Sequence, residues 1–239
     1  MKTRTFLITG ASKGIGRALA DRLAHRGHQV VGLARSADAS FPGKLVSVDL
    51  SDLRQTDAAL GEFRGTFEFD GLVNNVGLVR PQRIGDVQIE DLDAVFAANL
   101  HPAVQAMQAL LPGMREAGWG RVVNISSLTV LGALERTAYA AAKSALISFS
   151  RSWALELATT GITVNTVAPG PTETELFRKN SPPGSAGEKR FLSSVPMNRF
   201  GKPDEIAAAI EFLLSEDAAF ITGQTLFVDG GASVGKSLV

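Results

Sequence analysis

Tyr139 and Lys143 are the residues whose types and spacing point most directly to proton-transfer chemistry. They lie four positions apart in the segment 138–159, which has a helical pattern, so both side chains fall on one helix face. A tyrosine hydroxyl has an ordinary pKa of about 10 and is a weak acid or base at neutral pH. A neighbouring ammonium stabilises the phenolate and lowers that pKa, which suits the hydroxyl to general acid–base catalysis.

A second chemical signal is the glycine-rich segment 9–16, which reads Thr-Gly-Ala-Ser-Lys-Gly-Ile-Gly and lies between a predicted strand and a predicted helix. Gly10 permits a tight turn, Gly14 lets the backbone approach a pyrophosphate, and Gly16 lets the helix pack closely on the sheet. Ile15 stands where a Walker-type phosphate loop needs lysine, so that motif does not fit. The segment predicts a dinucleotide site.

The second predicted strand indicates which dinucleotide binds. An NAD site needs a carboxylate just after this strand to accept a hydrogen bond from the ribose, and Ala34 and Arg35 stand there instead. A guanidinium can pair with the 2′-phosphate of NADP(H), and Lys13 in the glycine loop can add a second cation. The alternative is that both are solvated surface residues. The sequence therefore predicts NADP(H) in preference to NAD(H).

Two further strand ends are predicted to meet the cofactor. Asp49 and Leu50 follow the third strand, where a carboxylate can accept a hydrogen bond from the adenine amino group. The segment 74–77, Asn-Asn-Val-Gly, follows the fourth strand, and its glycine permits close approach of the backbone to a ligand. Either segment alone is also compatible with an ordinary turn.

Positioning these residues requires alternating strands and helices. Short apolar runs with little polar alternation are typical of strands covered on both faces, and they alternate with segments of helical period. The pattern predicts an α/β fold, a doubly wound parallel sheet of about seven strands with helices on both faces, built as a single domain over residues 1–239. Predicted strands are 6–9, 29–33, 44–48, 71–74, 121–125, 162–167 and 225–228, and predicted helices are 14–26, 52–63, 89–114, 138–159 and 203–214.

The segment 172–200 stands apart because it follows a strand end, has weak periodicity and contains Ser-Pro-Pro-Gly-Ser at 181–185. Ligands of such sheets bind at the carboxyl ends of the strands, so this segment is a candidate substrate lid. An ordinary surface loop is the alternative.

Composition excludes several classes of function. The chain has 239 residues, 45% of them hydrophobic, and 24 basic residues balance 24 acidic ones. That balance argues against a nucleic-acid-binding protein. The absence of cysteine excludes disulfides, thiolate nucleophiles and cysteine-ligated metals. His25, His28 and His101 lack metal-ligand spacing, and no apolar run suggests a signal peptide or a membrane span. A cytoplasmic protein is expected.

Taken together, the glycine motif, Asn-Asn-x-Gly, the strand-end serines and Tyr-x-x-x-Lys resemble the classical short-chain dehydrogenase/reductase family. The resemblance covers essentially the whole chain and includes Asn99, the segment 167–170 (Val-Ala-Pro-Gly) and the segment 227–231 (Phe-Val-Asp-Gly-Gly). It implies a Rossmann-type fold, an oxidoreductase acting on a ketone or a secondary alcohol, and a homo-oligomer, either a tetramer or a dimer. The helices 89–114 and 138–159 would pair across one dimer axis, although the apolar content of 140–158 is equally consistent with simple packing on the sheet.

The resemblance also implies a role for each site residue. Tyr139 exchanges a proton with the substrate oxygen, Lys143 tunes Tyr139 and binds the nicotinamide ribose, and Asn99 positions a water in a proton relay. A strand-end serine holds the substrate oxygen. The implied cofactor-binding residues are Gly10, Ser12, Lys13, Gly14, Ile15, Gly16, Arg35, Asp49, Leu50, Asn75, Val76, Gly77, Tyr139, Lys143, Pro169, Gly170, Thr172 and Thr174.

The identity of that serine is open between two neighbours. In the family the catalytic serine is usually the second of the pair and lies thirteen residues before the tyrosine. Here Ser127 is second but twelve residues away, whereas Ser126 has the spacing of thirteen. Strand register decides which side chain enters the site and the following loop can absorb a deletion, so Ser127 is favoured.

The expected substrate is a small-molecule or acyl-thioester carbonyl compound. In the segments 161–165, 169–175 and 221–224 the chain most resembles the 3-oxoacyl-[acyl-carrier-protein] reductases of this family. Arg178 stands where a basic residue for an acidic carrier protein is expected, but the segment 116–119 lacks the usual basic cluster. Sugar or secondary-alcohol oxidation therefore stays open. A catalytically idle NADP(H)-binding sensor is a further alternative, although such proteins typically lose the tyrosine or the lysine, and both are present.

Overall fold

Seven strands form one parallel sheet in the order β3-β2-β1-β4-β5-β6-β7 in the computed structural model, which describes residues 2–63 and 65–235. The predicted fold class is confirmed: the sheet is doubly wound, and the order reverses between β1 and β4. The strands are β1 (Thr5–Thr9), β2 (Gln29–Ala34), β3 (Lys44–Ser47), β4 (Gly71–Asn74), β5 (Gly120–Ile125), β6 (Ile162–Pro169) and β7 (Thr225–Val228).

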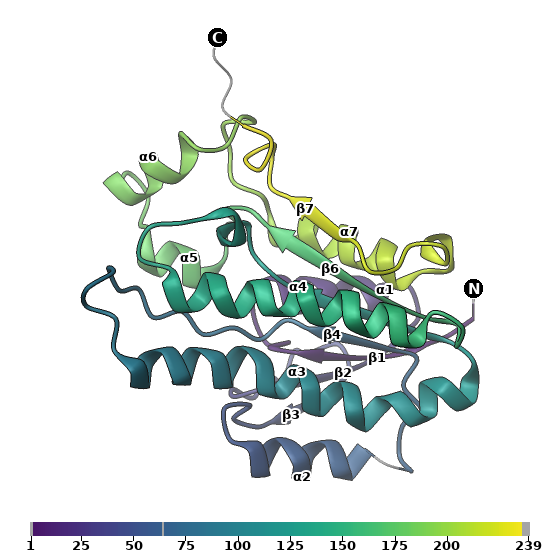
Figure 1. Cartoon of the computed structure of the whole chain (residues 1–239). Coiled ribbons are helices and arrows are strands. Elements are labelled where there is room, and N and C mark those ends of the chain that lie inside the picture. Colours follow the sequence, from purple (N-terminus) through teal and green to yellow (C-terminus); the bar gives the residue numbers. More distant parts are fainter. Residues whose placement is uncertain (1, 64, 236–239) are drawn as a thin grey trace.

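Helices cover both faces of this sheet (Figure 1). One face carries α1 and α7, and the other carries α2, α3 and α4. The helices are α1 (Gly14–His25), α2 (Leu53–Phe63), α3 (Ile89–Ala117), α4 (Thr137–Leu157), α5 (Glu175–Asn180), α6 (Ala186–Leu192) and α7 (Pro203–Leu214), with short 3₁₀ turns η1 (Leu128–Leu131) and η2 (Glu216–Ala218). No helix in the described parts of the chain is long and apolar enough to cross a membrane.

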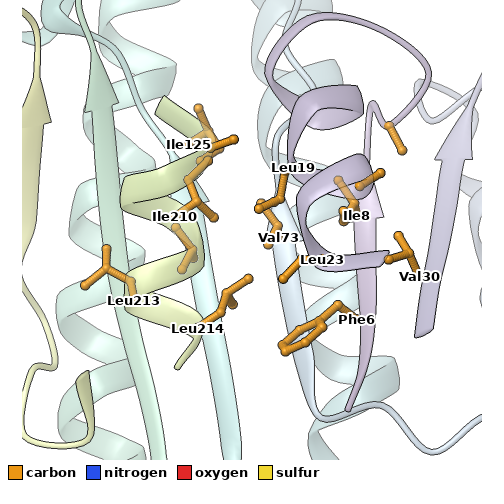
Figure 2. Close-up of a cluster of buried hydrophobic side chains, with 14 of the residues drawn as sticks. Phe6, Ile8, Leu19, Leu23, Val30, Val73, Ile125, Ile210, Leu213 and Leu214 are labelled. Carbon is orange, nitrogen blue, oxygen red and sulfur yellow. The ribbon is translucent and has the colours of Figure 1, made fainter. Parts of the chain in front are cut away.

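The hydrophobic core is divided by the sheet into two layers. Figure 2 shows the layer between the sheet and helices α1 and α7, where Leu19 and Leu23 of α1 lie near Ile210 of α7. Leu19 and Leu23 are four residues apart, so α1 presents one apolar stripe to the strands. The second layer is formed by β-strand side chains with α2, α3 and α4. Because both faces are covered, the strands are apolar throughout rather than alternating.

A buried polar network crosses the second layer. The Asn74 side-chain amide donates to Asn124 Oδ1 at 2.8 Å, and Asn124 donates to the Ser150 hydroxyl on α4 at 2.8 Å. Thr166 Oγ1 lies 2.7 Å from the same Ser150 oxygen, which itself donates to the carbonyl of Leu146. Hydrogen bonds thus join β4, β5 and β6 to α4 at positions that are otherwise apolar.

Element bounds agree with the predicted ones to within three residues, but the segment 172–200 differs in kind. It contains the helices α5 and α6, where weak periodicity predicted an irregular insert. Each has only six or seven residues, which is too short to show a helical period, and each begins at a hydroxyl cap, Thr174 or Ser185. The insert is closed at its base, because Glu173 N donates to Gly201 O at 2.8 Å and Gly201 N to Pro171 O at 3.0 Å.

Candidate active site

The carboxyl ends of β1, β4, β5 and β6 meet at one edge of the sheet, and most of the predicted site residues follow these ends. Tyr139 and Lys143 come to this edge from the first two turns of α4. The helix is rich in alanine at its start, which favours helix formation. The two functional side chains therefore have only small side chains between them. Lys143 Nζ lies 5.8 Å from the centre of the Tyr139 ring.

Lys143 is almost completely buried, with 2% of its surface exposed. Its ammonium donates to the carbonyls of Ile125 at 2.9 Å and Val76 at 3.2 Å, which lie just at the ends of β5 and β4. Burial lowers the pKa of Lys143 to about 7, because the charged form loses its hydration. The lysine is therefore held where a small change in its surroundings alters its charge at neutral pH.

The pKa of the Tyr139 hydroxyl shifts in the direction opposite to the expected one. Burial raises the pKa of its hydroxyl, and a side-chain hydrogen bond with Ser127 and the positive charge of Arg136 oppose that rise. This direction is opposite to the expected lowering of the Tyr139 pKa by Lys143. The physical reason is that the loss of hydration outweighs the nearby favourable contacts, while Lys143 directs its ammonium at backbone carbonyls. Tyr139 is held as a neutral proton donor.

The two serines have different surroundings. Ser127 Oγ accepts a hydrogen bond from Thr129 N at 3.2 Å, and its hydroxyl is close enough to Tyr139 to lower the pKa of that side chain. Ser126 is buried, with 3% exposed, and its hydroxyl donates to the backbone carbonyl of Lys143 at 2.9 Å. Neighbouring residues of an extended chain point to opposite sides, so only one hydroxyl can face the tyrosine. This geometry favours Ser127 as the residue at the reacting atoms.

Asn99 approaches the same place from α3. Its side-chain NH₂ donates to Val95 O at 2.7 Å and Leu78 O at 3.0 Å, which fixes the orientation of the amide. Its Oδ1 atom is buried and has no hydrogen-bond partner among the described residues. A Cβ atom at Gly77 would lie 3.2 Å from that oxygen and 3.3 Å from Lys143 Nζ, so both polar groups face the space beside Gly77. Such a buried acceptor suits a bound water.

The glycine loop has the shape that its sequence predicts. Gly10 and Gly14 have φ values of +66° and +55°, and a Cβ at Gly16 would lie 2.4 Å from Gly10 O. Helix α1 begins at Gly14, and in the described chain its N-cap, Lys13, makes no side-chain capping hydrogen bond. The first N–H groups of α1 therefore suit an anionic group such as a pyrophosphate.

Other predicted cofactor residues are positioned by contacts within the chain. Asn75 Nδ2 donates to the carbonyls of Thr9 and Gly10, both at 3.1 Å, and so ties the end of β4 to the glycine loop. Asp49 lies two residues beyond β3, and its Oδ1 accepts hydrogen bonds from the backbone and hydroxyl of Ser51, which lower the pKa of Asp49. Arg35 is exposed directly after β2. Its side chain is therefore open to solvent at the predicted 2′-phosphate position.

The start of the insert lies against the glycine loop. Thr174 Cγ2 would be 3.3 Å from a Cβ at Gly14, and Thr172 Oγ1 donates to Gly170 O at 2.9 Å. Lys13 forms an ion pair of 2.8 Å with Glu175, the first residue of α5. Sequence reasoning missed Glu175, because no spacing rule relates two residues so far apart in the chain.

Arg178 does not stand free at the entrance. Its guanidinium pairs with Glu173 at 2.7 Å and with Glu188 of α6, and it lies 5.2 Å from the centre of the Phe200 ring. Arg178 thus ties together the parts of the insert. The predicted role in binding an acidic carrier protein would require these pairs to exchange.

Known proteins resemble this chain over most of its length. A family model described as "Enoyl-(Acyl carrier protein) reductase" matches residues 10–233. The 3-oxoacyl-[acyl-carrier-protein] reductase of Escherichia coli (strain K12) is 40% identical over 235 residues, covering 94% of this chain and 95% of that protein.

Solved structures of oxidoreductases have the same fold as this chain. The ligand-free aldohexose dehydrogenase of Thermoplasma acidophilum has a TM-score of 0.91 at 29% identity, covering 100% of this chain and 96% of that one. YwfH, an NADPH-dependent reductase involved in bacilysin biosynthesis, has a TM-score of 0.89 at 28% identity, covering 97% and 98%. The similarity therefore covers at least 94% of this chain and at least 95% of each of these proteins.

Proposed function

The chain belongs to the short-chain dehydrogenase/reductase family, whose members are NAD(P)-dependent oxidoreductases acting on CH–OH groups, and we propose that it is an NADP(H)-dependent enzyme interconverting a ketone and a secondary alcohol. The observation that supports this proposal most strongly is the buried Lys143, whose ammonium lies 5.8 Å from the Tyr139 ring, with Ser127 close enough to Tyr139 to affect its pKa. All three lie at the edge of the sheet that also carries the glycine loop.

In this proposal Tyr139 donates its hydroxyl proton to the carbonyl oxygen during reduction and takes it back during oxidation. Ser127 holds the substrate oxygen, since the contact from Thr129 N to its Oγ leaves the hydroxyl proton free to point away. Lys143 and Asn99 face the space beside Gly77, where a water can return the proton to Tyr139. When bound, the nicotinamide supplies or accepts the hydride at the substrate carbon.

The residues present fit an NADP(H) molecule. The uncapped start of α1 and the absence of side chains at Gly10, Gly14 and Gly16 suit the pyrophosphate, with Ser12 and Ile15 alongside. Asp49 and Leu50 would meet the adenine. Towards the nicotinamide we propose the residues Asn75, Val76, Gly77, Lys143, Pro169, Gly170, Thr172 and Thr174.

We expect kcat/KM to be at least about tenfold higher with NADPH than with NADH, because Arg35 and Lys13 can form charge-assisted hydrogen bonds with a 2′-phosphate. The similarity to an NADPH-dependent reductase supports this preference. Steady-state rates for a panel comprising an acetoacetyl thioester, small ketones, sugars and secondary alcohols, with each cofactor, provide the test. Preference for NADH would overturn the cofactor assignment. Tight NADPH binding without turnover of any compound would favour the sensor.

Two substrate classes are supported by specific observations. The 40% identity to a 3-oxoacyl-[acyl-carrier-protein] reductase supports a 3-oxoacyl thioester. The engagement of Arg178 by Glu173 and Glu188 disfavours docking of an acidic carrier and supports a free small molecule, as does the likeness to an aldohexose dehydrogenase. The thioester is the first choice, and a sugar or secondary alcohol is the second.

Replacing Ser127 with alanine should lower kcat about 10²-fold, because a hydrogen bond at the reacting oxygen is lost. The matched variant Ser126→Ala removes only the hydroxyl that binds the Lys143 carbonyl and should lower kcat much less, with some loss of thermal stability. Steady-state kinetics and thermal unfolding of both variants provide the comparison. A larger loss of kcat in Ser126→Ala would reverse the assignment.

We also propose a cytoplasmic homo-oligomer, a tetramer or a dimer, with α3 and α4 at one dimer axis. Leu155 of α4 is 81% exposed and Ile89 of α3 is 64% exposed, as expected of residues that a second copy covers.

A further inference from the structure

One ion pair joins the glycine loop to the insert 172–200. Lys13 Nζ lies 2.8 Å from Glu175 Oε2, and the side chains of Lys13 and Glu175 are 64% and 70% exposed. The hydrogen bond and the charge of Glu175 raise the pKa of Lys13 further above neutral pH. Water reaches both partners, and an exposed pair of this kind is weak enough to exchange.

The pair lies on the wall of a cavity of about 500 Å³ that opens to solvent beside the start of α1. The second cation there, Arg17, is already paired with Asp21 at 3.0 Å and with Asp38. An anion that enters this cavity therefore meets cations that already have acidic partners. The cavity wall also includes Glu173 and Thr174.

We propose that Lys13 exchanges partners when the cofactor binds, and that Glu175 is the residue it leaves. In the cofactor-free protein the Glu175 carboxylate occupies the position of an anion on Lys13, and the 2′-phosphate of NADP(H) displaces it. Glu175 thereby sets the affinity for the 2′-phosphate. This inference rests on the proposed function, because it takes the 2′-phosphate to lie at Lys13.

The same exchange connects cofactor recognition to the insert. Glu175 is the first residue of α5, whose cap Thr174 lies against Gly14 and accepts a hydrogen bond from Phe177 N at 3.1 Å. Arg178 in the next turn of α5 is paired with Glu188 of α6. Release of Glu175 therefore frees the start of α5 from the glycine loop, and the Arg178 pair transmits that change to α6.

Calorimetric titration with adenosine 2′,5′-bisphosphate and with 5′-AMP isolates the contribution of the 2′-phosphate. Glu175→Gln should bind the bisphosphate about three- to fivefold more tightly, because Lys13 no longer has a competing carboxylate, and should bind 5′-AMP as the wild type does. The matched control Glu173→Gln removes an acidic residue of the same cavity that pairs with Arg178, and its affinities should not change.

The variant Lys13→Met completes a double-mutant cycle. It should bind the bisphosphate more weakly, and in its background Glu175→Gln should give no further gain. An equal gain from Glu173→Gln, or a gain that persists without Lys13, would show a general charge effect and overturn the exchange. Equal wild-type affinity for the two nucleotides would overturn the proposed cofactor preference as well. A clear wild-type preference that Glu175→Gln leaves unchanged would overturn the exchange alone.

Amide hydrogen exchange of α5 and α6 provides an independent readout of the connection to the insert. The bisphosphate should increase exchange in α5, whereas 5′-AMP should leave it unchanged, since only the former displaces Glu175. Identical exchange with both nucleotides would refute the connection.

Discussion

Tyr139→Phe should lower kcat for carbonyl reduction by about 10²- to 10⁴-fold, the usual contribution of a general acid. The phenyl ring keeps the packing of Tyr139 against Ala138, Ala142 and Val95, so the fold should be retained. Only the hydroxyl is lost, and with it the proposed proton donor beside Ser127. Steady-state kinetics with NADPH, together with fluorescence titration of NADPH binding, provide the measurement.

The binding titration separates chemistry from folding. NADPH affinity should change by less than about threefold, because the proposed contacts of the dinucleotide with the glycine loop remain. Retention of kcat within about tenfold would show that another group delivers the proton. Since burial raises the pKa of Tyr139, the free protein holds the proton needed for reduction at neutral pH, and the oxidation rate should increase as pH rises.

Lys143→Met should have the second large effect, lowering kcat by about 10²-fold or more, because the charge and the proton relay beside Tyr139 are removed. It should also change the pH dependence of stability. The pKa of Lys143 is about 7 in the folded protein against an ordinary 10.5, so between these values the unfolded chain binds one more proton. The free energy of unfolding of the wild type therefore rises with pH across this window, by on the order of 4 kcal/mol.

Urea unfolding at pH 7, 8.5 and 10 measures this rise. In Lys143→Met the rise due to this group should be absent, so the stability of the variant relative to wild type should be greatest near pH 7 and decrease towards pH 10. Lys189→Met removes an exposed lysine of α6 and should keep the wild-type dependence. A variant of Lys143 that follows the wild-type curve would contradict the low pKa.

The features that could be predicted from the sequence are those specified by local rules. The glycine motif predicts a tight turn and a close approach of helix α1 to the loop, because only glycine fits such positions. The structure has both, with positive φ at Gly10 and Gly14 and no room for a Cβ at Gly16. Tyr139 and Lys143 share a helix face because helical spacing requires it. The strand ends could be placed because short, continuous apolar runs are typical of parallel strands that helices cover on both faces.

The features that could not be predicted depend on contacts between distant segments. Glu175 meets Lys13 only because the insert folds back on the glycine loop, and no periodicity reports that. The pKa of Tyr139 rises because the folded chain removes water from its hydroxyl. The spacing between Tyr139 and Lys143 in the sequence does not predict that burial. The choice between Ser126 and Ser127 needed the direction of each side chain at the end of β5.

The buried hydrogen bonds of Ser150 determine how accurately α4 positions the Tyr139 hydroxyl. Ser150 is seven residues beyond Lys143 on the same face of α4, and it is bonded to β5 and β6. A slip of α4 by one residue turns a helix by about 100° and advances it by about 1.5 Å, and it would break these bonds. The rotation of α4 about its axis, and with it the direction of Tyr139, is therefore fixed about 16 Å away, three turns along the helix, by buried amide and hydroxyl groups outside the proposed catalytic set.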